Sequence, residues 1–213
     1  MGDRILIAGA SGLIGGLVLG RMGETAITLG RRRLDSIPNE QLVGAVETWP
    51  DLIVAARPTT VICALGTTQR SAGSREAFRA IDHDAILAVA TAAKNAGAGR
   101  LLLVSSVGAS SRSPVFYLRT KGETEDAVIA LKFERLDIFR PGLLTGSRRE
   151  HRPSEQLTIR LSPLTDALTP SFLDRYRSIA ARDVANAMVA SLAATGHGIY
   201  IHHNREMLRL ARG

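Results

Sequence analysis

The sequence has little cysteine, few aromatic residues and no long apolar run. Cys63 is the single cysteine among 213 residues, so no disulfide can form within the chain and a reducing compartment is expected. It lies inside the apolar run 61–65, which predicts a buried structural thiol. Because no stretch of eighteen apolar residues is present, we expect neither a membrane-spanning helix nor a membrane partner. We therefore expect a cytoplasmic protein.

Acidic residues are also in the minority. Lys and Arg total 27 against 20 for Asp and Glu, which gives a net charge of +7. A basic chain raises the question of nucleic acid, but aromatic residues make up only 4% and do not interleave with the arginine runs, as base stacking would require. We therefore expect no nucleic-acid partner. A phosphate-rich ligand and solubility account for the positive charge.

Apolar runs alternate with helical patterns along the chain. A chain of 213 residues that is 45% apolar predicts one domain over residues 1–213 with a sizeable core. Strands that are apolar on both faces, alternating with helices, predict a mainly parallel sheet covered on both sides, an α/β doubly wound fold. The strands are expected at 5–8, 26–29, 42–46, 60–65, 100–105, 135–139 and 198–202, and the principal helices at 13–22, 75–95, 115–130 and 183–194.

Three segments have a weaker pattern. A short helix is expected over 52–56, capped by the Asp51 carboxylate, and the small polar residues 66–74 are expected to form a loop. Periodicity is weak over 147–178, where a small substrate-side insertion is predicted. It would form a small carboxyl-terminal lobe of the single domain.

The most informative motif is a glycine turn near the start. Gly9, Gly12 and Gly15 follow the buried strand 5–8 at intervals of three and lead directly into an apolar helix. Such a turn needs a residue that tolerates positive φ, then a bare backbone for a pyrophosphate to approach, then a small residue where helix meets strand. The helix N-terminus presents free N–H groups to phosphate. The motif therefore predicts a dinucleotide-binding turn.

An arginine run follows the second strand. Where dinucleotide-binding folds that use NAD have an acidic residue for the ribose 2′-hydroxyl, this chain has Gly30, Arg31 and Arg32. Guanidinium groups bind a phosphate through paired, charge-assisted hydrogen bonds. The alternative is a solvated charged turn. The position favours cofactor binding, so NADP (NADPH) is predicted in preference to NAD.

A catalytic constellation follows the strand at 100–105. Tyr117 and Lys121 lie four residues apart on a predicted helix, so both side chains share one face. An ammonium one turn from a phenol favours phenolate, which lets a tyrosine exchange a proton with a substrate oxygen while hydride moves at carbon. Ser105 and Ser106 end the preceding strand, where a hydroxyl could hold that oxygen. The doublet leaves open which serine does so.

These motifs together resemble the short-chain dehydrogenase/reductase superfamily, in its extended or atypical form, with a Rossmann fold. More narrowly, the chain is similar to the small Tat-interacting-protein type of oxidoreductase. The superfamily likeness is carried by the three glycines, Ser105-Ser106, Tyr117-x-x-x-Lys121, Arg140-Pro141-Gly142 and the segment 181–185. The narrower likeness is carried by the segments 29–34, 63–68, 117–123, 131–135 and 139–142.

The resemblance implies a role for each matching residue. The catalytic group is Ser106, Tyr117 and Lys121, and Asp82 would support the lysine through water. The cofactor would contact Gly9, Ser11, Gly12, Leu13 and Ile14 at the pyrophosphate, Arg31 and Arg32 at the 2′-phosphate, Leu65 and Gly66 along adenosine, Lys121 at the nicotinamide ribose, and Pro141, Gly142 and Leu143 at the carboxamide. Ser105 is also expected to contact the cofactor, or to replace Ser106 in the catalytic group.

The function expected from these residues is NADP(H)-dependent oxidation or reduction of a small alcohol or carbonyl substrate. The alternative is an NADPH-binding regulatory or sensor protein with little turnover. An intact Ser106, Tyr117 and Lys121 set favours the enzyme, since a sensor has no need of a phenolate. A sugar-nucleotide epimerase is less favoured because such relatives are usually much longer. No metal site is expected, and a homodimer or another protein is a candidate partner.

Overall fold

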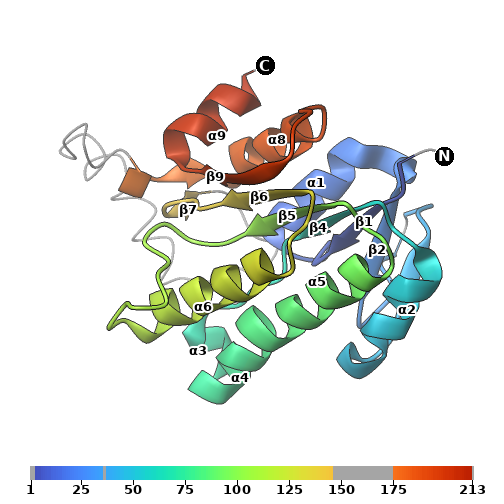
Figure 1. The fold of residues 1–213 in the computed structure, drawn as a ribbon, viewed down its shortest axis with the longest axis horizontal. Coiled ribbons are helices and arrows are strands. Elements are labelled where there is room, and N and C mark those ends of the chain that lie inside the picture. Colours follow the sequence, from blue (N-terminus) through green and yellow to red (C-terminus); the bar gives the residue numbers. More distant parts are fainter. Residues whose placement is uncertain (1–2, 36, 146–174, 213) are drawn as a thin grey trace.

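The computed structural model describes residues 3–35, 37–145 and 175–212 (Figure 1). Seven strands of this part of the chain form one sheet in the order β3-β2-β1-β4-β5-β6-β9, and every neighbouring pair is parallel. The predicted doubly wound α/β fold is therefore confirmed. The strands are β1 (Ile5–Ala8), β2 (Ala26–Gly30), β3 (Gln41–Val43), β4 (Thr60–Cys63), β5 (Arg100–Val104), β6 (Arg135–Phe139) and β9 (Gly198–His202).

Helices cover both faces of the sheet, as Figure 1 shows. Side chains of one sheet face pack against α2 (Trp49–Ala56), α5 (Ile86–Asn95) and α6 (Phe116–Ala130) in one apolar cluster. The other face packs against α1 (Leu13–Met22), α8 (Ala181–Ser191) and α9 (Asn204–Ala211) in a second cluster. The central strands β1 and β4 are buried at every position, because both of their faces are covered.

The long helix predicted over 75–95 is present, but it is not a regular α-helix throughout. It consists of α4 (Arg75–Arg79), a π-helical turn η3 (Ala80–Ala85) and α5. Ser74 begins it, because its hydroxyl accepts a hydrogen bond from the Ala77 N–H at 3.0 Å. π-Helical turns are uncommon and occur often at functional sites.

Several expected boundaries are wrong. Helix α2 begins at Trp49 rather than at residue 52, since Pro50 is well tolerated in a first turn, and Asp51 lies within that turn instead of capping it. The expected loop 66–74 contains the short helix α3 (Gln69–Ala72), which the Thr68 hydroxyl caps. Helix α8 spans 181–191 instead of 183–194, β3 spans 41–43 instead of 42–46, and α9 was not predicted.

Most of the expected insertion at 147–178 lies outside the described residues, so its form stays a prediction. The described residues beside it form a second, two-stranded parallel sheet, in which β7 (Leu144–Thr145) pairs with β8 (Ile179–Ala180). The Ile179 N–H donates to the Leu143 carbonyl at 2.9 Å. Within the described ranges, no helix combines the length and apolar character needed to cross a bilayer.

A buried carboxylate joins three strands on the α8 face. Asp137 on β6 is fully buried and accepts hydrogen bonds from Arg135 at 2.8 and 2.9 Å, Arg100 at 2.9 Å and the His202 ring at 2.9 Å. Arg100 also donates to the Leu192 and Ala194 carbonyls at the end of α8. Burial alone would raise the pKa of Asp137, but these hydrogen bonds from His202, Arg135 and Arg100 lower it to about 2.

We predict that Asp137→Asn lowers the free energy of unfolding at neutral pH by about 3–5 kcal/mol, because two arginines lose a buried carboxylate. Because the pKa of Asp137 is lower in the folded state, its carboxylate stabilises the fold at pH values above its ordinary pKa of 3.8. That stabilisation is lost as the pH falls toward about 2. Urea unfolding measured across this range would test both statements. An equally steep acid loss in the variant would contradict the assignment.

Candidate functional site

The three glycines of the predicted turn each meet a steric constraint. Gly9 has φ of +92°, and a Cβ there would lie 2.6 Å from the Ala64 carbonyl oxygen on the neighbouring strand end. A Cβ at Gly15 would lie 2.2 Å from the Gly9 oxygen, so α1 packs directly against the turn. The Gly12 N–H donates to the Gly9 carbonyl at 2.9 Å, which closes the turn. The backbone geometry is therefore that of a close phosphate-binding turn.

The start of α1 is open to a ligand. Gly12 is its N-cap and has no side chain with which to accept the first N–H groups, and Ser11 and Gly12 are both exposed. The N–H groups of Leu13 and Ile14 lie in the first turn, where a helix supplies no carbonyl partner. A dinucleotide pyrophosphate fits this arrangement, because it needs exposed N–H donors and a backbone without side chains.

Arg31 and Arg32 follow β2 at the same edge of the sheet. Both side chains are exposed, and within the described part of the chain neither forms an ion pair. The backbone is held in place because the Gly44 N–H donates to the Gly30 carbonyl at 3.1 Å. Two guanidinium groups are thus presented next to the glycine turn.

A buried ion pair lies at the same edge, next to the segment that follows β4. Lys121 Nζ lies 2.7 Å from Asp82 Oδ1, and both side chains are almost completely buried. The resemblance implied a contact between Asp82 and the lysine through water, whereas the structure shows a direct one. Burial alone would lower the pKa of Lys121, but the attraction and hydrogen bond of the Asp82 carboxylate, together with Tyr117, raise that pKa overall. The ammonium is therefore retained at neutral pH.

One short segment touches both the glycine turn and the ion pair. Residues 64 and 65 pack against Gly9, where the Ala64 oxygen and the Leu65 nitrogen leave no space for a side chain. A Cβ at Gly66 would lie 3.4 Å from the Asp82 carboxylate and 3.7 Å from Lys121 Nζ. The Thr67 N–H donates to Asp82 Oδ2 at 2.7 Å. Segment 64–67 therefore brings the turn and the buried lysine to adjacent places at the carboxyl ends of the strands.

Tyr117 lies one helical turn before Lys121 and is only partly buried. Its ring packs against Phe78, with centroids 5.5 Å apart, and Phe78 is itself fully buried on α4. The helix that carries the tyrosine is held close to the loop that follows β5. A Cβ at Gly122 would lie 2.1 Å from the Ser110 carbonyl carbon, and the Ser110 N–H donates to the Leu118 carbonyl at 3.1 Å.

The two serines that follow β5 have different environments. Ser105 is buried, and its hydroxyl donates to Glu125, which also accepts from Arg140 Nε at 3.0 and 3.1 Å. Ser106 is partly exposed, and its hydroxyl contacts the Val107 carbonyl at 3.3 Å. Ser105 is therefore committed to a buried network, while Ser106 is the more accessible of the two hydroxyls.

The turn after β6 closes the site on its far side. Pro141 is buried, and its carbonyl accepts a hydrogen bond from the Val107 N–H at 2.9 Å. Gly142 lies so close to a second segment that a Cβ would be 2.2 Å from the Arg177 oxygen. Leu143 is 43% exposed at the rim. The turns after β5 and β6 are thus hydrogen-bonded to each other.

Three residues of the site were not predicted from the sequence: Phe78, Gly122 and Glu125. For Glu125 a signal exists, because it lies four residues after Lys121 and eight after Tyr117 on the same helix face. Nothing local distinguishes Phe78 from any other core position. Gly122 is explained only by the loop that packs against it.

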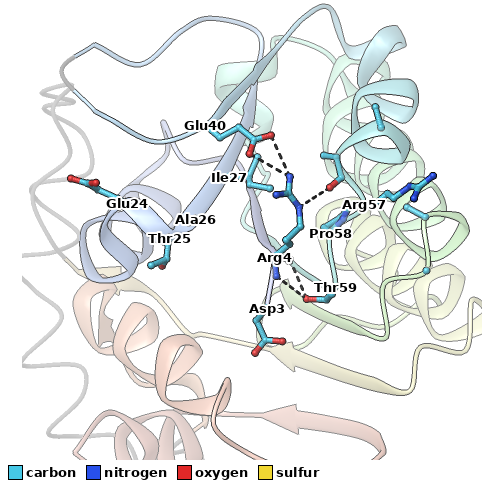
Figure 2. Close-up of a pocket in the computed structure, with 14 residues that line it drawn as sticks. Asp3, Arg4, Glu24, Thr25, Ala26, Ile27, Glu40, Arg57, Pro58 and Thr59 are labelled. Carbon is cyan, nitrogen blue, oxygen red and sulfur yellow. Dashed lines mark hydrogen bonds and ion pairs between the residues drawn. The ribbon is translucent and has the colours of Figure 1, made fainter. Parts of the chain in front are cut away.

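A hollow of about 810 Å³ lies at the other edge of the sheet, where β1, β2 and β4 begin (Figure 2). Arg4 crosses it, with Nε donating to the Ala56 carbonyl at 2.9 Å and the terminal nitrogen paired with Glu40 at 3.3 Å. Ligands of doubly wound sheets bind at the carboxyl ends of the strands. We therefore assign the functional site to the opposite edge.

Comparison with known proteins identifies the family. The HIM1 family model matches residues 35–171. The rat protein HTATIP2 is 34% identical over an alignment that covers 98% of this chain and 89% of its own. The chain belongs to the HIM1 family. A second relative is "Protein FMP52, mitochondrial" of Lodderomyces elongisporus, which is 38% identical over 170 residues, or 71% of each chain.

The HIM1-family chain shares its fold with solved nucleotide-binding enzymes. The Bordetella bronchiseptica enzyme WbmH, in complex with NAD+, superposes with a TM-score of 0.70 at 18% identity, covering 95% of this chain and 76% of that one. dTDP-4-dehydrorhamnose reductase from Bacillus anthracis, in complex with NADP, gives 0.67 at 18% identity, with 95% and 76% covered. The predicted Rossmann fold is therefore confirmed, and the narrower resemblance to the Tat-interacting-protein type is confirmed by the rat relative.

One expectation is wrong. The FMP52 relatives from Lodderomyces elongisporus, Meyerozyma guilliermondii and Candida albicans are all named as mitochondrial proteins. These names contradict the cytoplasmic location that we expected. A single buried cysteine and the lack of a long apolar run are compatible with more than one reducing compartment, so neither feature identifies the compartment.

We predict that Gly15→Ala destabilises the protein by about 1–3 kcal/mol, because the new methyl group has no space beside the Gly9 carbonyl. Gly20→Ala is the matched control on the same helix, since a Cβ there meets nothing within 4 Å. That control should stabilise the protein by about 0.5–1 kcal/mol through helix propensity. Urea denaturation of both variants measures the difference, and equal effects would refute the close packing of α1 against the turn.

Proposed function

We propose that this protein is an NADP(H)-dependent oxidoreductase that acts by hydride transfer on a small carbonyl or alcohol substrate, with Tyr117 as the acid/base. The observation that carries the proposal is the placement of segment 64–67. It touches the glycine turn at Gly9 and the Lys121–Asp82 pair at Gly66. A phosphate-binding turn and a buried ammonium beside a tyrosine thus share one edge of the sheet.

The residues proposed to hold the cofactor follow its length along this edge. The N–H groups at the start of α1 bind the pyrophosphate, and Arg31 and Arg32 bind the 2′-phosphate through charge-assisted hydrogen bonds. Lys121 donates to the nicotinamide ribose. The adenosine lies along Leu65 and Gly66, and the carboxamide lies against Pro141, Gly142 and Leu143.

The chemistry proposed for the remaining residues concerns one substrate oxygen. The cofactor, when bound, supplies or accepts the hydride at the adjacent carbon. Tyr117 gives its phenolic proton to that oxygen in reduction and takes it back in oxidation, and the Ser106 hydroxyl donates a hydrogen bond to the same atom. Lys121 stabilises the phenolate through its charge. Asp82 keeps the Lys121 ammonium charged and fixed in position.

We predict that the protein binds NADPH more tightly than NADH and that Arg31→Ala with Arg32→Ala removes the difference. Hydrogen bonds to charged groups contribute about 1.5–3 kcal/mol each, so NADPH affinity should fall at least about tenfold while NADH affinity stays within about twofold. Fluorescence titration of the reduced nicotinamide measures both affinities.

The matched control removes two other exposed arginines, Arg205 and Arg209 on α9. This variant loses the same charge and should keep the preference for NADPH. Equal binding of NADPH and NADH by the unmodified protein would overturn the assignment of the arginines. Failure to bind either would overturn the proposed function.

We predict that Tyr117→Phe lowers kcat roughly 100-fold or more, because proton transfer by a positioned side chain contributes about 10²–10⁴-fold. NADPH affinity should barely change, since the ring and its packing on Phe78 remain. Turnover is measured by the loss of NADPH absorbance with small aldehydes and ketones. Unaltered turnover in the variant would exclude Tyr117 as the acid/base, and cofactor binding without any turnover would favour the sensor alternative.

A further inference from the structure

The segment Arg175–Ser178 leads into β8 and lies against the site. Its backbone passes over the turn after β6, because a Cβ at Gly142 would lie 2.2 Å from the Arg177 oxygen and 3.1 Å from the Tyr176 oxygen. The buried Asn204 side chain on α9 holds both partners, since its oxygen accepts from the Gly142 N–H at 3.3 Å and its nitrogen donates to the Arg177 carbonyl. The segment is therefore fixed beside the residues proposed to contact nicotinamide.

The Tyr176 side chain extends from this segment over the turn that carries Ser106. Tyr176 Cε1 would lie 3.9 Å from a Cβ at Gly108, and the Leu118 methyl groups would lie 3.5 and 3.8 Å from the same position. Leu118 is the residue after Tyr117. The Tyr176 ring thus lies close to the turn after β5 while its backbone lies over the turn after β6, yet 45% of the residue is exposed.

Arg175 adds a cation to this aromatic surface. Its guanidinium lies over the Tyr176 ring, 4.9 Å from the centroid, and the residue is exposed. In the parts of the chain that the structure describes, Arg175 forms no ion pair, whereas the nearby Arg140 is neutralised by Glu125. Burial lowers the pKa of His203, and the positive charges of Arg140 and Arg175 lower it further, so this neighbouring ring is uncharged at neutral pH.

We propose that Arg175 and Tyr176 line the substrate-binding side of the site. We propose further that the substrate carries an anionic group, a carboxylate or a phosphate, on a flat or apolar moiety. The inference rests on the proposed function and adds the substrate class. A planar guanidinium binds either anion through two parallel hydrogen bonds. The exposed ring of Tyr176 offers an apolar face for the body of the molecule, while the carbonyl or alcohol group lies toward Tyr117 and Ser106.

The test uses the full chain saturated with NADPH and a series of simple aromatic ligands: benzoate, phenyl phosphate and the neutral benzamide. Quenching of the bound NADPH fluorescence reports their binding. We expect benzoate or phenyl phosphate to bind at least about tenfold more tightly than benzamide. The tighter of the two anions identifies whether a carboxylate or a phosphate is preferred.

Two variants distinguish a specific contact of Arg175 with the anion from an effect of the protein's net charge. Arg175→Gln should reduce the anion preference to about twofold or less, whereas Arg57→Gln, which removes an exposed arginine at the opposite edge of the sheet, should leave it unchanged. The same contrast is expected in kcat/KM for 4-formylbenzoate against 4-formylbenzamide. A loss of preference in both variants would show only a net charge effect and would overturn the inference.

The outcomes also separate this inference from the proposed function. If NADPH binds and turnover depends on Tyr117, but anionic and neutral ligands bind equally, the inference alone fails. If Arg175→Gln leaves the preference intact, the anion is held elsewhere and the inference again fails. If NADPH does not bind at all, the proposed function fails and the inference fails with it.

Discussion

The ion pair between Lys121 and Asp82 is the interaction on which the arrangement of the site depends. A buried ammonium is tolerated only beside an opposite charge. Three parts of the chain meet to provide this: the π-helical turn η3 supplies Asp82, α6 supplies Lys121, and the Thr67 N–H binds the second carboxylate oxygen. Gly66 lies directly against the pair, since a Cβ there would be 3.4 Å from the Asp82 carboxylate. The helix covering β4 and the helix after β5 are therefore placed relative to each other by charge as well as by packing.

Helix α6 distributes the polar contacts of the site along one face. Tyr117, Lys121 and Glu125 follow one another at intervals of four residues. The lysine contacts the helix at 75–95, and the glutamate contacts Ser105 and Arg140 at the ends of β5 and β6. The buried carboxylate of Glu125 thus holds both strand ends against the helix that carries the tyrosine. A displacement of this helix would alter the whole site at once.

The sheet was predictable from the sequence because parallel strands covered on both faces are continuous apolar runs. The bounds of β6 and β9 agree with the prediction at both ends. Helix α9 was missed because it is short, and Met207 is its only fully buried apolar side chain. The glycine turn, Tyr117 and Lys121 were recognisable from spacing. The direct contact of Asp82 was not, since it depends on a π-helical turn, and the choice between Ser105 and Ser106 depends on Glu125, which lies twenty residues away.

The reactivity of the single cysteine can report local unfolding of the sheet around β4. Cys63 ends β4 at the centre of the sheet, is fully buried, and has a thiol whose pKa is raised by burial to about 11. Thiolate is the reactive form, so alkylating reagents are excluded both by access and by protonation while the sheet is intact. The rate of thiol modification therefore measures how often the strands beneath the glycine turn separate, and a ligand that contacts both β1 and β4 at this edge would slow it.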